Sequence, residues 1–259
     1  MGDAFNNINV FLLKMETVVA FEEIKFSVSG NDVKGTFLRN YYFILSSESL
    51  EQIGSYKIIN EALVFAEREK RVWNKFNPLL DAGLSQLIHK IHEKPCLYVH
   101  SGSGIPLIGS NEFGIVDRGS NILEVKPLTG CNLACTFCSV NEGVNNKTDV
   151  LVQEEYLVSV FKEVVKIKEH PVEANIGPQG EPLLYPKIVD LIKDLKANGA
   201  SVVSINTNGT LLHKKLVDEL FAAGLDRINL SLHTLNQEQA DNIMGGKLAL
   251  KRLTEMTDY

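Results

Sequence analysis

The chain has 259 residues, of which 44% are hydrophobic and 22% charged, with a formal net charge of −6. This composition is ordinary for a soluble globular protein of one or two domains, and it argues against a protein that binds nucleic acid irrespective of sequence. No apolar run reaches the ~20 residues that span a bilayer, and the N-terminus lacks the basic start and cleavage site of a secretory signal. We therefore expect a cytoplasmic protein.

The first part of the chain, residues 1–118, is expected to form a smaller α+β region of unknown role. Ile24, Phe26 and Val28 alternate with polar residues, which is typical of a half-buried strand. The elements expected here are strands over 21–45, a polar connection or short helix over 47–55, helices over 58–74 and 79–92, and a strand over 96–100. Glycine-rich and polar loops at 101–104 and 116–120 place the end of this region near residue 118.

Residues 119–259 alternate between strand and helix patterns. The predicted strands are 122–125, 173–176, 201–206 and 227–233, and the predicted helices are 153–168, 187–197 and 212–223. Strands that alternate with helices across short loops predict a parallel sheet with helices packed against it. Right-handed crossovers would curve that sheet like part of a (β/α) barrel.

Two of these strands alternate apolar with polar residues, although strands buried on both faces usually read as continuous apolar runs. Val203 and Ile205 alternate with Ser204 and Asn206, and the last strand shows the same pattern. The apolar set can pack on the helices while the polar set lines the inside of the sheet. A sheet that is half exposed to water is the alternative.

Three of the four cysteines, Cys131, Cys135 and Cys138, are spaced C-x3-C-x2-C, with Phe137 directly before the last one. Clustered thiolates are ligands of iron–sulfur clusters, and three of them leave one iron of a cubane open. Zinc is the alternative, but it needs a fourth ligand, and the nearest histidines are remote in sequence. Cys96 stands alone and is read as a buried apolar side chain, although it could serve as a remote fourth ligand.

The cysteine spacing and Phe137 resemble the C-x3-C-x-Φ-C loop of the radical S-adenosylmethionine (radical SAM) superfamily, where Φ is aromatic. The resemblance implies a [4Fe-4S] cluster held by Cys131, Cys135 and Cys138. It also implies that the open iron chelates the amino and carboxylate groups of S-adenosylmethionine, with Phe137 near the adenine.

A second stretch, 177–184, resembles the GGEPLL segment of the same family, which meets the amino group of the cofactor. Gly180 and Glu181 carry over directly, because glycine lets backbone approach a ligand and a carboxylate can accept from an ammonium group. Gln179 departs from the family pattern, in which glycine is frequent at that position.

Two further stretches resemble the family at the ends of the third and fourth strands. The TNGTLL-like segment offers Asn206, Thr207 and Asn208 as cofactor contacts. The VSLD-like segment offers Ser231 to the ribose or the carboxylate of the cofactor. His233 stands where an acidic residue is common, so its role is left open.

The resemblance covers about residues 119–246, and the run 106–131 is similar to an uncharacterised archaeal group of the superfamily. It implies an enzyme that reductively cleaves S-adenosylmethionine to a 5′-deoxyadenosyl radical, with electrons from an external ferredoxin- or flavodoxin-like protein. The substrate is not specified: RNA or tRNA modification and peptide or cofactor maturation are both open, and no residue is assigned to act on it. The chain has fewer βα units than the family usually has, so we expect a fragment whose activity is open.

Two other classes of function compete with this one. The first is an iron–sulfur module that binds a cluster or transfers electrons without S-adenosylmethionine chemistry, and the second is a zinc-stabilised domain.

Overall fold

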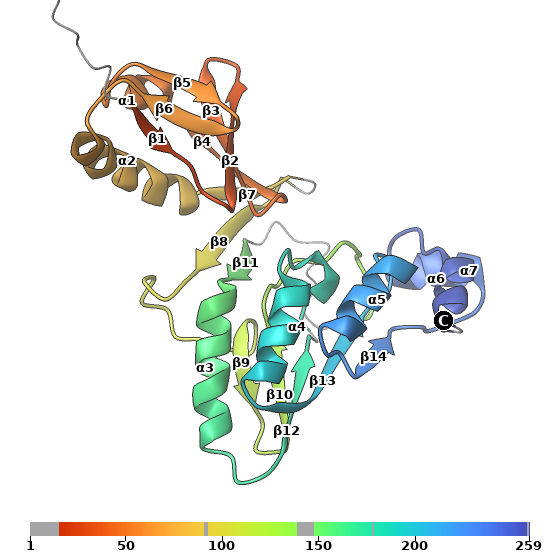
Figure 1. Cartoon of the computed structure of the whole chain (residues 1–259). Helices are drawn as coiled ribbons and strands as arrows, with labels where there is room; N and C mark the ends of the chain where they lie inside the picture. The colour runs from red at the N-terminus through yellow and green to blue at the C-terminus, as the bar shows by residue number, and fades with distance from the viewer. Residues whose placement is uncertain (1–15, 91–92, 139–147, 178, 258) are drawn as a thin grey trace, which may run out of the picture. The chain divides into compact units, whose positions relative to one another are not determined.

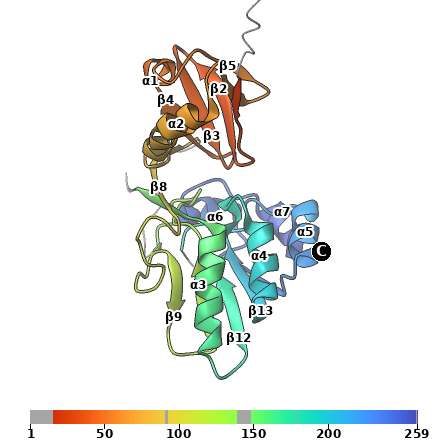
Figure 2. The same cartoon turned by 60° about the vertical axis from the view of Figure 1, so that its left-hand side comes forward.

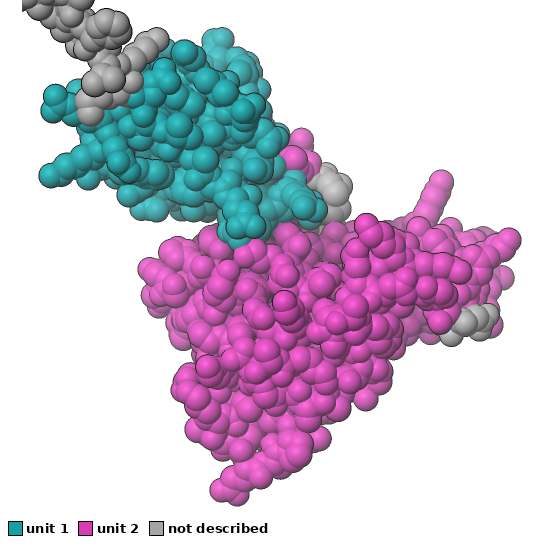
Figure 3. All heavy atoms as spheres, in the orientation of Figure 1, with its two compact units in different colours: residues 1–86 teal, residues 87–259 magenta. Residues whose placement is uncertain are grey.

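The computed structural model describes residues 16–90, 93–138, 148–177, 179–257 and 259 (Figure 1). Pro178 of the GGEPLL-like stretch and the polar residues 145–147 lie outside the described residues. The contacts divide the chain into two compact units, Met1–Gln86 and Leu87–Tyr259 (Figure 3). The domain boundary at residue 118 stays a prediction. No helix among the described residues is long and apolar enough to cross a membrane.

Unit 1 is built from two antiparallel ladders and one long helix. Its elements are β1 (Thr17–Val19), β2 (Ile24–Ser29), β3 (Asp32–Phe37), β4 (Tyr41–Leu45), α1 (Ser47–Glu51), β5 (Tyr56–Ile59), β6 (Ala62–Phe65) and α2 (Glu69–Leu84). β2 pairs with β3 and β3 with β4, while β6 lies between β1 and β5. Phe26, Phe65 and Phe76 are fully buried and in contact, so they tie both ladders to α2.

The helix predicted over 58–74 is wrong, because its first half is a β-hairpin. Ile59 pairs with Ala62, and the two residues between them, Asn60 and Glu61, have φ values of 49° and 62°. Positive φ at both central residues is the geometry of a tight two-residue hairpin turn. The helix predicted over 79–92 is also displaced, since α2 ends at Leu84 and a strand follows.

Unit 2 contains the predicted alternation of strands and helices. Its elements are β7 (Leu87–His89), β8 (Pro95–Val99), β9 (Gly114–Asp117), β10 (Ile122–Lys126), β11 (Asp149–Val152), α3 (Glu154–Lys166), β12 (Val172–Ile176), the 3-10 helix η1 (Pro182–Leu184), α4 (Ile188–Ala197), β13 (Ala200–Thr207), α5 (Lys214–Ala222), β14 (Arg227–Leu230), α6 (Gln237–Met244) and α7 (Leu250–Thr257). Five of the strands form a sheet in the order β14-β13-β12-β10-β9, in which β9 alone is antiparallel.

Helices α3, α4 and α5 lie side by side along one face of this sheet (Figures 1 and 2). Leu191, Ile192 and Leu195 of α4 are fully buried, as are Val203 and Ile205 of β13 beneath them. Within the described residues the sheet stays open, with β14 and β9 at its edges. The fold is therefore α/β, a partial (β/α) barrel preceded by a smaller α+β region, as predicted.

The polar residues of the strands hydrogen-bond to one another across the sheet. Asn229 donates to Asn206 and Asn206 to Asn175, each through its side-chain nitrogen at 2.8 Å. Asn175 in turn donates to the hydroxyl of Ser204 at 2.8 Å. We call this row the amide ladder. Because buried polar groups need partners, the ladder explains how polar side chains are tolerated in these strands.

Strands β10, β12, β13 and β14 run parallel, so their carboxyl ends share one edge of the sheet. The loops that leave these ends carry all four stretches identified in the sequence. This edge is where open α/β sheets build their binding sites.

Candidate active site

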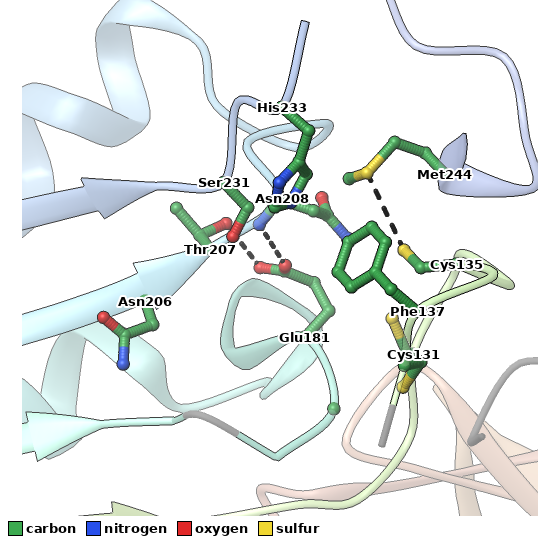
Figure 4. A pocket seen from close by; sticks show the side chains of 12 residues that line it. Cys131, Cys135, Phe137, Glu181, Asn206, Thr207, Asn208, Ser231, His233 and Met244 are labelled. Carbon is green, nitrogen blue, oxygen red and sulfur yellow. Dashed lines mark hydrogen bonds between the residues drawn. The ribbon is translucent and has the colours of Figure 1, made fainter. Parts of the chain in front are cut away.

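A pocket of about 240 Å³ opens at the carboxyl edge of the sheet (Figure 4). It is lined by every residue that the sequence predicts to hold the cluster or the cofactor, and in addition by His233 and Met244. The full lining is Cys131, Cys135, Phe137, Cys138, Gly180, Glu181, Asn206, Thr207, Asn208, Ser231, His233 and Met244.

The cysteine loop, residues 131–138, follows β10 and supplies three thiols to one side of the pocket. Burial, and after it the negative charges of Glu181, Cys135 and Cys138, raise the pKa of Cys131 to about 11, against an opposing hydrogen bond from the backbone N–H of Leu133. The pKa of Cys135 is also raised, first by burial and then by Cys138. The thiols of Cys131 and Cys135 therefore resist ionising unless a cationic centre binds beside them.

The donor atoms are present, but they do not form a closed ligand set by themselves. Among the described residues, no group of three or more His, Cys, Asp or Glu side chains is arranged to hold a metal ion. Cys96 does not line the pocket; it is buried in β8, where burial and then Asp149 raise the pKa of its thiol. This placement agrees with its interpretation as a packed side chain.

Glu181 is 1% exposed and binds both flanking elements. Its Oε1 accepts from the backbone N–H of Leu183 at 3.0 Å and from the hydroxyl of Thr207 at 2.7 Å. Its Oε2 accepts from the backbone N–H of Asn208 at 2.8 Å. Burial raises the pKa of Glu181, and these hydrogen bonds oppose that shift. The carboxylate thus joins η1 to the end of β13, a role that the sequence resemblance does not reveal.

Gly180 brings the GGEPLL-like stretch against the cysteine loop. Its φ is +63°, and a Cβ at this position would lie 2.5 Å from the backbone oxygen of Gly130. The next residue, Glu181, donates its backbone N–H to that same oxygen at 2.8 Å. Only glycine permits this approach. The contact fixes the stretch beside Cys131.

Asn132, inside the cysteine loop, is a further site residue that sequence reasoning missed. Its side chain donates to the hydroxyl of Thr210 at 2.8 Å and accepts from Asn208 at 2.9 Å. Asn208 also accepts from the backbone and hydroxyl of Thr210. The loop is therefore cross-linked to the end of β13. The available signal was a polar residue between two of the clustered cysteines.

An aromatic pair closes another side of the pocket. The ring centroids of Phe137 and His233 are 4.4 Å apart at an interplanar angle of 60°. Phe137 remains 54% exposed, so its ring keeps a free face. Ser231 is positioned by a 2.9 Å hydrogen bond from its backbone N–H to the backbone oxygen of Thr207.

The family model of the radical SAM superfamily matches residues 125–259, more than half of the chain. The chain belongs to the radical SAM superfamily. It is 42% identical over 183 residues to the uncharacterized protein MJ0103 of Methanocaldococcus jannaschii, covering 68% of this chain and 42% of that protein. It is 36% identical over 138 residues to the GTP 3′,8-cyclase of Chlorobaculum tepidum, covering 53% and 39%. The predicted likeness to an archaeal group is thus confirmed, and the chain spans about two fifths of these relatives' length.

Two solved structures are also similar to this radical SAM chain. BtrN in complex with AdoMet and 2-DOIA is 21% identical, with a TM-score of 0.38 over 46% of this chain and 48% of that one. Streptococcus suis SuiB bound to S-adenosylmethionine is 16% identical, with a TM-score of 0.38 over 89% and 52%.

Radical SAM membership implies a [4Fe-4S] cluster and S-adenosylmethionine. The residues present fit both groups. Three thiols that line one pocket, two of them with pKa values raised by burial, suit a cluster whose iron would stabilise the thiolates. Amides, a hydroxyl and a half-exposed aromatic ring in the same pocket suit a polar cofactor that carries an adenine. The fit rests on the chemistry of the donors.

Proposed function

We propose that Cys131, Cys135 and Cys138 ligate a [4Fe-4S] cluster and that the chain is a radical SAM enzyme. One observation supports the proposal: motif residues at the carboxyl ends of three further strands, β12, β13 and β14, line the same pocket as the three thiols. When bound, the cluster and S-adenosylmethionine would supply a 5′-deoxyadenosyl radical able to take hydrogen from a substrate.

The other lining residues have tasks that follow from their chemistry. Phe137 offers the free face of its ring to the adenine. Ser231 and Asn206 offer a hydroxyl and an amide, and the amide ladder fixes the orientation of Asn206. Glu181 holds the pocket wall together through its backbone partners, and its carboxylate would offer negative charge to the amino group of the cofactor.

We propose a chemical class for the reductant and several for the substrate. Reductive cleavage needs one electron from an external carrier, for which a ferredoxin- or flavodoxin-like protein is the candidate. The substrate classes to be tested are RNA, a peptide and, from the name of the cyclase relatives, a purine nucleotide.

Zinc binding is a second candidate, because the fold supplies the fourth ligand that the sequence near the cysteines lacks. His233 is remote from the cysteines in sequence, yet it lines the same pocket. Cys131, Cys135, Cys138 and His233 would give the three sulfurs and one nitrogen of a structural zinc site. This candidate predicts that zinc binding needs His233, whereas cluster ligation by three cysteines does not.

The deciding experiment compares two cysteine variants of the full chain after anaerobic reconstitution with iron and sulfide. Cys135→Ala should lose the [4Fe-4S] absorption and electron paramagnetic resonance signals, whereas Cys96→Ala, the matched control outside the pocket, should keep them. With S-adenosylmethionine and dithionite, the wild type should release 5′-deoxyadenosine.

The other outcomes separate the candidates. A cluster that forms without release of 5′-deoxyadenosine would support the iron–sulfur module or an inactive fragment. A colourless protein that retains zinc, and loses it in His233→Ala, would support the zinc site. An unchanged cluster spectrum in Cys135→Ala would refute the ligand assignment.

A further inference from the structure

The cysteine loop is held in place by the C-terminal end of α6, a segment far from it in sequence. Ala134 donates its backbone N–H to the carbonyl of Met244 at 3.2 Å, and Thr136 donates to the carbonyl of Ile243 at 2.9 Å. The hydroxyl of Thr136 also donates to Ile243, at 3.3 Å. The last carbonyls of a helix have no partner inside the helix. Here the residues on both sides of Cys135 supply those partners.

The residue after α6, Gly245, allows this close contact. It ends the helix in the left-handed conformation, with a φ of 61°. A Cβ at Gly245 would lie 2.1 Å from the backbone oxygen of Ala134. Because the clash is with backbone, rotation of a side chain cannot relieve it. Any larger residue must push the cysteine loop away from α6.

Met244 covers the Cys135 sulfur. Its side chain is 2% exposed, and its Sδ lies 3.8 Å from the Sγ of Cys135 (Figure 4). Met244 packs in a buried apolar group with Leu133 of the loop, Ala240 of α6 and Leu253 of α7. One face of the Cys135 sulfur is therefore in apolar surroundings.

We propose that the segment 243–246, the helix-end clamp, positions the ligand Cys135 and sets the polarity around its sulfur. This inference rests on the proposed function, in which Cys135 binds an iron of the cluster. Mutating a group that orients a metal ligand typically lowers metal affinity about 10- to 100-fold. Hydrogen bonds to the sulfurs of a cluster shift its reduction potential. Gly245 would govern how well the loop accepts the cluster, and Met244 would govern its potential.

The test uses four variants of the full chain, reconstituted anaerobically beside the wild type. Gly245→Ala should bind iron roughly 10-fold more weakly. Gly30→Ala is its matched control, because Gly30 has a φ of +62° in unit 1 but no atom within 4 Å of the added Cβ. Met244→Gln places N–H donors beside Cys135, so the reduction potential should rise. Met244→Leu keeps the site apolar and should leave the potential unchanged.

The readouts are iron bound per chain and the midpoint of a potentiometric titration followed by electron paramagnetic resonance. If the wild type takes up no cluster, the proposed function and this inference fall together. If the wild type is loaded while Gly245→Ala binds iron equally well and Met244→Gln has the wild-type potential, the inference alone is wrong. Should Gly245→Ala not fold, by circular dichroism of the apo chain, the potential of Met244→Gln decides.

Discussion

Replacing Glu181 by alanine should strongly destabilise unit 2 even when no cluster or cofactor is bound. The carboxylate accepts three hydrogen bonds, from the backbone of Leu183 and Asn208 and from the hydroxyl of Thr207, and all of these residues are buried. A buried donor left without its acceptor costs about 1–3 kcal/mol. Removing the carboxylate also removes the free-energy cost of burying a charged group, so we expect a net loss of folding stability of about 3–5 kcal/mol.

The loss is large against a total folding stability of about 5–15 kcal/mol. It can be measured by urea unfolding of the apo chain, followed by far-ultraviolet circular dichroism. Glu155→Ala is the control, because Glu155 forms an exposed ion pair with Lys187 at 3.2 Å, and such pairs contribute about 0–1 kcal/mol. If Glu181→Ala were as stable as Glu155→Ala, the carboxylate would not join η1 to β13, and its role would be confined to the cofactor.

Two further predictions concern residues outside the cysteine loop. Burial, followed by the charges of Asp194 and Glu155, raises the pKa of Glu154 to about 7 from 4.5, against the opposing charge of Lys187. Between pH 4.5 and 7 the folded state holds a proton that the unfolded state releases, so the free energy of unfolding should fall as pH rises. In urea unfolding at pH 5 and pH 8, Glu154→Gln should reduce the difference between the two free energies by about 1–3 kcal/mol. An equal difference in the variant and the wild type would contradict this assignment of the pKa shift. Gly180→Ala should lower the thermal midpoint more than Gly104→Ala, because both glycines have positive φ but only Gly180 meets backbone, that of Gly130. Equal midpoints would show that the close approach is not needed for folding.

The core helices and strands could be predicted because the apolar residues of each recur at the spacing of that element. The helix expected over 187–197 is observed as Ile188–Ala197, and the strand expected over 201–206 as Ala200–Thr207. In both, apolar residues facing the same layer recur at the spacing of the element, and glycine marks the end of the helix.

Two strands of unit 2, β9 and β11, lie outside the predicted elements because each is only 4 residues long. The loop that the sequence predicts over 116–120 overlaps the end of β9 (Gly114–Asp117), since Gly119 and Ser120 follow this strand closely. β11 (Asp149–Val152) follows a polar segment and pairs with β8, about fifty residues earlier. Neither strand is long enough to show a period, and only the tertiary pairing specifies it.

The site could be predicted from motifs because parallel strands bring their carboxyl ends to one edge, which gathers residues from 131 to 231 into a single pocket. Met244 and Asn132 could not be found this way. Their contacts form where the cysteine loop meets the end of α6 and the end of β13, as between Ala134 and Met244, and no repeat in the sequence encodes such a contact. The contact of His233 with Phe137 could not be predicted either, because the two residues are far apart in sequence.

The helix-end clamp also has a consequence for the order of events during synthesis. The cysteine loop is synthesised well before the residues that hold it. Thr210, the partner of Asn132, follows 78 residues later in the sequence, and Met244, the partner of Cys135, follows 109 residues later. At ~5–20 residues per second, the three thiols are exposed for roughly 5–20 s before α6 exists. In that interval they are open to oxidation and to stray metal ions. Cluster insertion that follows translation of α6, rather than accompanying that of the loop, would meet ligands already in position.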